Sequence, residues 1–217
     1  MKKNPNIIFY IGWSELVNKK IFDNFLCICL HPSKLPLFRG GSPLQNQIIR
    51  NINSSSITLF KINKFIDGGP ITHQLSFSLS GDICAIFKRI EIRGFLLISK
   101  FINDFVDKKV VFKKHKLSKY KIYKRRKSSQ SYLNFKNLKH IKYVYFKNFV
   151  RMLTGPYPNA YTFLDKYKIK ILKIKKTQSA HPLLNKKIIE GKDNANGYII
   201  CLRDCKVKIL NSVIVKN

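Results

Sequence analysis

Short apolar runs alternate with polar turns along the first part of the chain. Residues 6–11 are apolar, β-branched and aromatic, a composition typical of a buried parallel strand. Ser14, a good helix N-cap residue, predicts a helix over the residues that follow it. The apolar run 26–30 predicts a second strand. A strand–helix–strand crossover is the unit of a parallel sheet, so the pattern predicts an α/β domain.

Further elements follow as far as residue 105. Ser42, Pro43 and Gln45 form a capping-box helix start, and the helix is expected to run to about Arg50. Residues 56–62 and 71–77 predict two more strands. From Ile83 to Phe105 the apolar residues recur at helical spacing, with Gly94 as a possible kink. This long helix is expected to cover one face of the sheet.

The second half of the chain has a different pattern. Residues 138–153 suit a helix. Residues 161–176 are strand-like, and a slip in the apolar phase between Ile171 and Leu172 predicts a bulge. Residues 198–202 and 207–215 predict two more strands. Short strands after an α/β unit indicate a separate small β-rich domain.

A basic stretch separates the two halves. Residues 108–127 hold eleven Lys and Arg residues in twenty positions, and no acidic residue. The interleaved Tyr120 and Tyr123 are compatible with nucleic-acid contacts, but a solvated connector is the simpler interpretation. We therefore expect an α/β domain over residues 1–107, a basic linker over 108–136 and a β-rich domain over 137–217.

The formal net charge of +31 has two explanations. A basic surface attracts polyanions such as RNA, or phosphorylated substrates. Alternatively, the abundance of Lys, Ile and Asn reflects AT-rich coding, which we take as the larger part. No apolar run approaches the roughly 20 residues of a membrane span. The five apolar residues 7–11 are too few for the core of a signal peptide, so a cytoplasmic location is expected.

The five cysteines predict neither a disulfide framework nor a metal site. Their number is odd, and their spacing matches no disulfide scaffold. Cys27 and Cys29 would point to opposite faces of a strand, which is poor geometry for chelation.

A histidine and an aspartate occur where strands of the predicted sheet end. His31 follows the second strand, and Asp67 lies on a glycine turn after a later strand. Because ligands of open α/β sheets bind at the carboxyl ends of strands, both side chains are expected to reach one crevice. Histidine exchanges protons near neutral pH, and a nearby carboxylate favours its imidazolium form. Each residue alone is commonly structural; the pairing is what predicts acid–base chemistry.

Residues 27–70 resemble the formyltransferase family that uses N10-formyltetrahydrofolate. The motifs that carry the resemblance are His31-Pro32-Ser33-Lys34-Leu35-Pro36, Arg39-Gly40 and Asp67-Gly68-Gly69-Pro70, and Arg125-Arg126-Lys127 and 156–160 also resemble it. The family implies a Rossmann-like parallel-sheet formyltransferase domain followed by a small β-barrel-like C-terminal domain. Only about 25 residues precede the catalytic strand, so the front strands of that sheet are expected to be missing, as in an N-terminally truncated chain.

The resemblance implies transfer of a formyl group to a primary amine. The attacking amine must be unprotonated, the developing oxyanion must be stabilised, and a proton must reach the leaving nitrogen. His31 and Asp67 are the implied catalytic residues. Gly68, Gly69, Arg39 and Gly40 are implied in binding N10-formyltetrahydrofolate, the formyl donor. For Arg39, holding the loop and meeting a substrate anion remain equal alternatives.

One position departs from the commonest family pattern. Cys29 stands two residues before the histidine, where the family usually has an asparagine that donates to the formyl oxygen. A thiol is a weak donor. Asn46 or a backbone amide is the expected substitute.

Three functions are compatible with these residues. The loop from Arg39 to Gln45 is similar to that of family members that formylate amino sugars, so a nucleotide-linked amino sugar is the first expected acceptor. Methionyl-tRNA is the alternative, because the basic C-terminal half suits a polyanion. The rival from another class is an inactive remnant or a basic binding module. Cys29 and the short front of the sheet favour this alternative.

Overall fold

The computed structural model describes residues 4–117, 119–164, 166–178 and 194–216. The chain forms two compact units. The first comprises Met1–Gln47, Ile52–Ser80 and Ala85–Arg125, and the second comprises Ile48–Asn51, Gly81–Cys84 and Arg126–Asn217.

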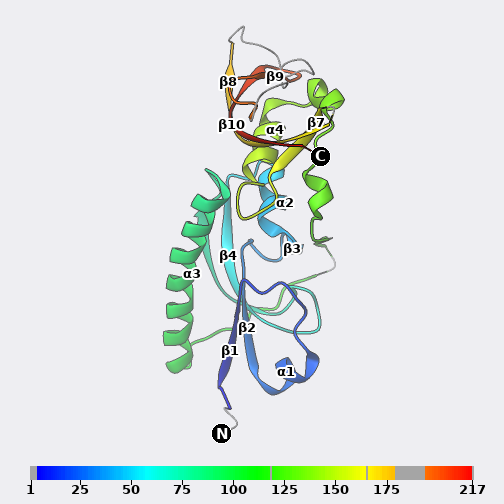
Figure 1. Cartoon of the computed structure of the whole chain (residues 1–217). Helices are drawn as coiled ribbons and strands as arrows, with labels where there is room; N and C mark the ends of the chain where they lie inside the picture. Colours follow the sequence, from blue (N-terminus) through cyan, green and yellow to red (C-terminus); the bar gives the residue numbers. More distant parts are fainter. Residues whose placement is uncertain (1–3, 118, 165, 179–193, 217) are drawn as a thin grey trace. The chain divides into compact units, whose positions relative to one another are not determined.

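The first unit is built on a four-stranded sheet (Figure 1). Its strands, in spatial order, are β1 (Ile7–Ile11), β2 (Leu26–His31), β4 (Ser54–Lys61) and β5 (Ile71–Ser78). β1 and β2 are parallel, which confirms the predicted crossover, and the Rossmann-like α/β class is confirmed with it. β4 and β5 each run antiparallel to their neighbour. The connection between β4 and β5 is too short for the crossover that a parallel pair needs, which accounts for the antiparallel pairing of these two strands.

The helix of the crossover begins later than expected. α1 (Lys19–Asn24) is capped by Asn18, whose side chain accepts a hydrogen bond from the backbone N of Lys20 at 2.9 Å. The prediction that Ser14 opens this helix is therefore wrong. Asparagine is an equally good N-cap residue, and the turn at Gly12, with φ of +65°, leads into a loop instead.

One long helix, α3 (Ile83–Val106), covers one face of the sheet (Figure 1). The Phe101 ring lies edge-on to Phe9 of β1 and His73 of β5, with centroid distances of 5.7 and 5.8 Å. The helix continues through Gly94, where a Cβ would lie 3.1 Å from Leu30 Cδ1 of β2. Glycine thus permits close packing here rather than a break.

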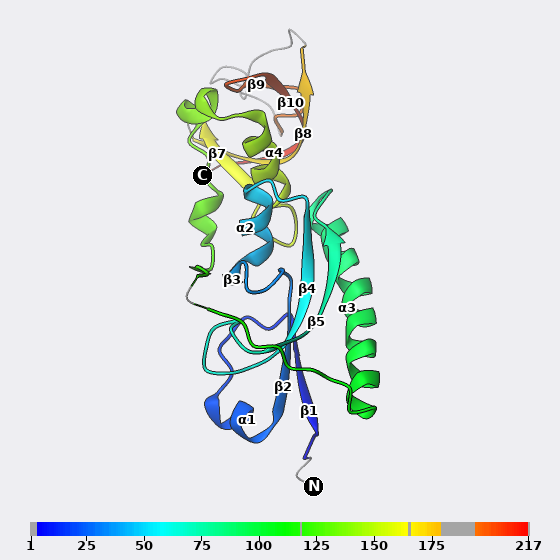
Figure 2. The same cartoon turned by 180° about the vertical axis from the view of Figure 1, so that it is seen from behind.

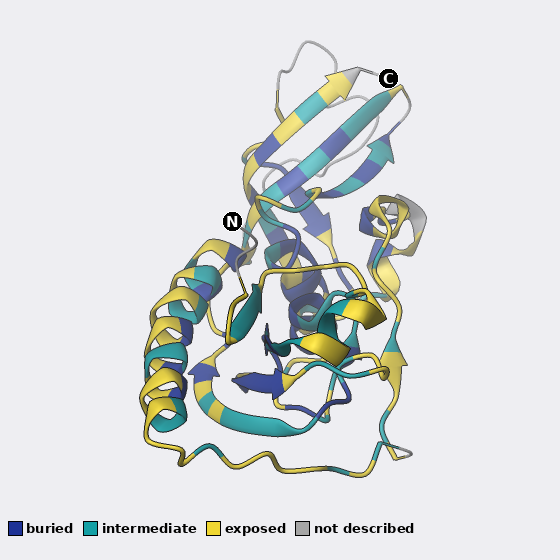
Figure 3. Ribbon diagram, turned by 90° about the horizontal axis from the view of Figure 1, so that it is seen from below, coloured by how far each residue is buried: buried dark blue, intermediate teal, exposed yellow. Residues whose placement is uncertain are grey.

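Burial divides α3 into two sides. Figure 3 shows exposed residues along one side of the helix and buried ones along the other. The buried side includes Ile86, Leu97 and Phe101. Within the described ranges, no helix combines the length and the apolar character that crossing a membrane would require.

The face of the sheet opposite α3 carries the candidate chemistry. Side chains alternate along a strand, so Leu30 toward α3 places Cys29 and His31 on the other face. In the strand register His31 lies opposite Thr58, and Thr58 lies opposite Gln74. A polar row therefore crosses the sheet at the end of β2.

Two short elements border this face. β3 (Arg39–Gly40) pairs in parallel with β6 (Ile122–Tyr123). α2 (Pro43–Ile49) begins at the proline, as the sequence predicts.

The second unit is built on an antiparallel sheet. Its strands, in spatial order, are β7 (Ala160–Leu164), β8 (Tyr167–Thr177), β10 (Lys206–Lys216) and β9 (Ile199–Cys201), and its helices are η1 (Ser128–Ser131), η2 (Phe135–His140) and α4 (Tyr143–Arg151). The β-rich C-terminal prediction is confirmed, and α4 packs against β8.

Two details of that prediction change. The single strand expected over 161–176 is two antiparallel strands, β7 and β8. The helix expected over 138–153 divides between η2 and α4. The predicted bulge is present: Asn211 pairs with Lys173 and Ser212 with Ile171, which passes over Leu172. Such a bulge bends the long strands.

Candidate active site

His31 is the last residue of β2, and both of its ring nitrogens face defined partners. Nε2 lies 3.0 Å from the carbonyl oxygen of Phe38. Nδ1 lies 3.6 Å from Oδ2 of Asp67, and the His31 side chain is only 8% exposed. Since a carbonyl oxygen can only accept, Nε2 is the donor to Phe38. Nδ1 is therefore the nitrogen left to exchange a proton, and it faces the carboxylate.

Asp67 is held in an uncommon backbone conformation. Its φ is +42°, in the left-handed region that aspartate tolerates better than most residues. Oδ2 accepts a hydrogen bond from the backbone N of Gly40 at 2.7 Å. The structure thus brings together three residues that the sequence singled out: His31, Asp67 and Gly40.

Arg39 braces the turn that carries Asp67. Its side chain is buried, and Nε and Nη2 donate to the carbonyl oxygen of Ile66 at 2.8 and 2.6 Å. Burial lowers the pKa of Arg39, and the negative charge of Asp67 acts in the opposite direction. Of the two alternatives for Arg39, this geometry favours holding the loop over meeting a substrate anion.

Gly68 and Gly69 have a packing role in the chain itself. A Cβ at Gly68 would lie 2.9 Å from Nη2 of Arg39, and a Cβ at Gly69 would overlap the carbonyl oxygen of Lys61. The tight turn after Asp67 therefore needs both glycines. Their contact with a folate remains a prediction.

Cys29 lies on the same face of the sheet as His31, two residues earlier. Burial, and then the charge of Asp67, raise the pKa of Cys29 to about 12. The side chain is therefore a neutral thiol at physiological pH, which is a weak hydrogen-bond donor.

Asn46, the expected substitute for the missing asparagine, is engaged elsewhere. Its amide nitrogen donates to the carbonyl oxygens of Gly41 and Ser42, each at 3.1 Å. In this conformation it braces the start of α2 and has both of its amide hydrogens directed to the backbone.

Thr58 supports the loop that follows His31, and sequence reasoning missed it. Its hydroxyl donates to the Ser33 carbonyl oxygen at 2.6 Å and accepts from the backbone N of Leu35 at 3.3 Å. It also accepts from Nε2 of Gln74 at 2.9 Å, and that nitrogen donates to the Leu35 carbonyl oxygen at 2.9 Å. Thr58 is fully buried.

Gln47 supports the same loop from α2. Its Nε2 donates to the carbonyl oxygen of Pro32 at 2.9 Å, and its Oε1 accepts from the hydroxyl of Ser55. Polar residues at buried positions are the signal that could have identified Thr58 and Gln47, since buried polar groups are normally paired.

Among the residues that the structure describes, no three His, Cys, Asp or Glu side chains are arranged so that they could hold a metal ion.

The outer face of the β7–β8 hairpin in the second unit combines basic and aromatic side chains. Phe163 pairs with Lys168 and Tyr161 with Lys170. Nζ of Lys168 lies 4.1 Å from the Tyr161 ring centroid. The Tyr132 ring lies 5.7 Å from that of Tyr161 and 5.6 Å from that of Phe163. We call these five residues the basic–aromatic face.

The chain is similar in sequence to methionyl-tRNA formyltransferases. The chain is 33% identical over 82 residues to the methionyl-tRNA formyltransferase of Buchnera aphidicola, which covers 37% of this chain and 26% of the relative. It is 28% identical over 106 residues to that of Thermotoga maritima, covering 48% and 33%. The curated relatives are matched over 26–38% of their length. No family model matches.

Solved structures with the same fold match a larger part of the chain. The methionyl-tRNA formyltransferase from Clostridium thermocellum has a TM-score of 0.73 at 27% identity, covering 98% of this chain and 79% of that one. A 4-N formyltransferase from Francisella tularensis has a TM-score of 0.62 at 21% identity, covering 74% and 66%. HypX from Aquifex aeolicus, solved with tetrahydrofolic acid, shares the fold with a TM-score of 0.72 at 12% identity, covering 98% and 37%.

The first unit, with His31 at the end of β2 and Asp67 on the connection between β4 and β5, has a Rossmann-like fold shared with a solved methionyl-tRNA formyltransferase. Together, the motif order, the sequence similarity and the shared fold support a relationship of the chain to the formyltransferase family.

Proposed function

We propose that this protein transfers the formyl group of N10-formyltetrahydrofolate to a primary amine. The observation that carries the proposal is the pairing of His31 Nδ1 with Asp67 Oδ2 at 3.6 Å, at the carboxyl end of β2. Bound N10-formyltetrahydrofolate would supply a formyl group that an amine nitrogen can attack.

Residues of the chain itself carry out the proton transfer and stabilise the charges that develop. His31, oriented through Nε2 by Phe38, uses Nδ1 to take up and release a proton and to stabilise negative charge at the formyl oxygen. Asp67 stabilises the imidazolium and orders the water that relays the proton. Gly40 N holds the Asp67 carboxylate in place for both roles.

For the acceptor we propose methionyl-tRNA. The methionyl-tRNA formyltransferase from C. thermocellum covers 98% of this chain, whereas the sugar N-formyltransferases cover 72–74%. The basic–aromatic face supports a polyanionic acceptor, because cations on an aromatic platform are a common means of holding RNA. A nucleotide-linked amino sugar is the second candidate, favoured by the sequence of the loop from Arg39 to Gln45.

Donor binding is tested by calorimetry with an N10-formyltetrahydrofolate analogue in which carbon replaces N10. We expect wild type to bind it, and Asp67→Ala to bind at least tenfold more weakly. Asp23→Ala, which changes an exposed aspartate of α1, is the control and should bind like wild type. Absence of binding by folded wild type would contradict the proposal and favour the non-catalytic remnant.

The acceptor is tested by the salt dependence of turnover. With methionyl-tRNA, Lys168→Gln/Lys170→Gln should raise KM and lower the slope of log affinity against log salt by about one per lost phosphate contact. Lys88→Gln/Lys108→Gln removes two exposed cations outside the basic–aromatic face and is the matched control. Turnover of a nucleotide amino sugar with little salt dependence, and none of tRNA, would overturn the choice of acceptor alone.

A further inference from the structure

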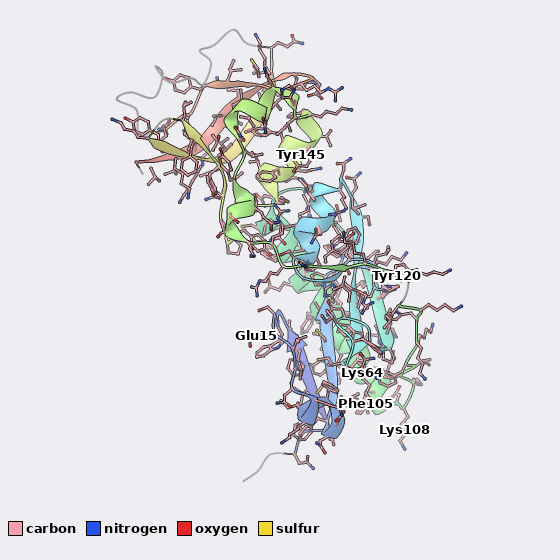
Figure 4. All side chains as sticks on the ribbon, turned by 90° about the vertical axis from the view of Figure 1, so that its right-hand side faces the viewer. Glu15, Lys64, Phe105, Lys108, Tyr120 and Tyr145 are labelled. Atoms are coloured by element: carbon pink, nitrogen blue, oxygen red, sulfur yellow. The ribbon has the colours of Figure 1, made fainter. Side chains whose placement is uncertain are left out.

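The basic stretch after α3 is part of the first unit, where it runs back along the site loops. Lys108 lies two residues after the end of α3 (Figure 4). Lys113 then forms a two-way bridge with Ile71 of β5: its carbonyl oxygen accepts from Ile71 N at 2.9 Å, and its N donates to Ile71 O at 2.8 Å. We call the described residues from 113 to 123 the basic strap (Figure 2).

The far end of the strap fastens the loop that contains Gly40. Gly41 N donates to the Tyr123 carbonyl oxygen at 2.7 Å. The Tyr123 ring stacks on that of Phe38, with centroids 5.4 Å apart and an interplanar angle of 21°. Phe38 is the residue whose carbonyl oxygen orients His31.

Between these ends, His115 contacts the turn that carries Asp67. Its Nε2 lies 3.1 Å from the carbonyl oxygen of Gly69 and donates to it. Leu117 of the strap lies beside Gly68, where a Cβ would be 2.9 Å from Leu117 Cδ1. The backbone on both sides of Asp67 is therefore tethered: Arg39 holds Ile66 O before it, and His115 holds Gly69 O after it.

Asp67 needs such support. A non-glycine residue at positive φ is strained and persists only where its surroundings enforce it. A displacement of about 1 Å in a catalytic group costs roughly 100-fold in rate. Loss of either tether would let the turn relax and carry the carboxylate away from His31.

We propose that His115 is a positioning residue that holds the Asp67 carboxylate toward His31 through the carbonyl oxygen of Gly69. The expected effect on rate rests on the proposed function. The effect on the position of Asp67 can be measured without turnover. It assigns the basic strap a role in the site that a linker would not have.

The structural test is amide hydrogen exchange without ligand. Gly40 N–H reports on Asp67, to which it donates, and Gly41 N–H reports on the strap through Tyr123 O. His115→Leu should speed exchange at Gly40 at least tenfold and leave Gly41 unchanged. His115→Gln, which keeps a donor near the Nε2 position, should restore protection. Lys116→Leu is the control on the neighbouring exposed residue.

Turnover provides the second readout. His115→Leu should lower kcat about 10- to 100-fold with the KM for the amine changed less than twofold, and His115→Gln should recover most of the rate. Should the leucine variant fail to fold, His115→Asn, whose amide reaches only the Nδ1 position, replaces it with the same expectations. Unchanged Gly40 exchange, equal acceleration at Gly40 and Gly41, or no rescue by glutamine would each overturn the proposal. Inactive wild type with the expected exchange pattern would refute the proposed function alone.

Discussion

Thr58→Val tests whether a buried hydroxyl supports the loop that positions His31. Valine keeps the branched shape of threonine, so the substitution opens no cavity in a site that is 0% exposed. What it removes is a donor to Ser33 O at 2.6 Å and an acceptor for Leu35 N and Gln74 Nε2 at 3.3 and 2.9 Å.

The expected loss of stability follows from these three bonds. A net contribution of about 0.5–1.5 kcal/mol applies to each intramolecular hydrogen bond. Leu35 N also donates to Ser33 O at 3.0 Å, and Gln74 Nε2 also donates to Leu35 O at 2.9 Å, so neither donor is left unpaired. Counting the short bond to Ser33 fully and the others in part gives about 2 kcal/mol.

The assay is urea unfolding followed by circular dichroism. With a slope of about 2 kcal/mol per molar urea, the midpoint should fall by about 1 M at an unchanged slope. Thr72→Val is the matched control: Thr72 is a strand residue whose hydroxyl makes one bond, to Leu59 O at 3.1 Å, so its shift should be less than half as large. Equal shifts in the two variants, or no shift in Thr58→Val, would refute this reasoning.

Two further predictions concern Cys29. Cys29→Asn restores an amide donor two residues before His31 and should raise formyl transfer at least tenfold, because one oxyanion donor is worth roughly 100- to 1000-fold; an equal or lower rate in a steady-state assay would contradict this. The second concerns alkaline stability. The folded-state pKa of Cys29, about 12, lies above the ordinary 9.0, so the unfolded chain loses its proton first and stability should fall above about pH 9, by up to about 1.4 kcal/mol per pH unit. Urea titrations from pH 8 to 10 should show a shallower decline in Cys29→Ala, with a remainder because burial also raises the pKa of Cys27; identical pH profiles would argue against a buried neutral thiol.

The sequence by itself determined several of the local elements. The apolar run that ends at His31 is β2, the proline of the capping-box sequence opens α2, and the apolar spacing from Ile83 to Phe105 is one face of α3. The phase slip at Leu172 marks the bulge opposite β10. These features depend on neighbours within a few positions along the chain, which is the range over which periodicity and capping act.

Tertiary structure alone decided how distant segments meet. In the sequence Gly94 allows a kink or a break in the helix, and only its contact with Leu30 makes it a packing position. For Arg39 the sequence allows two equal interpretations, and the hydrogen bond from its guanidinium to Ile66 O favours holding the loop. Thr58, Gln74 and His115 carried no motif, because each acts through a backbone carbonyl of another segment. A carbonyl oxygen is present at every residue, so no side-chain pattern reveals which one a donor will reach, and only the folded chain selects it.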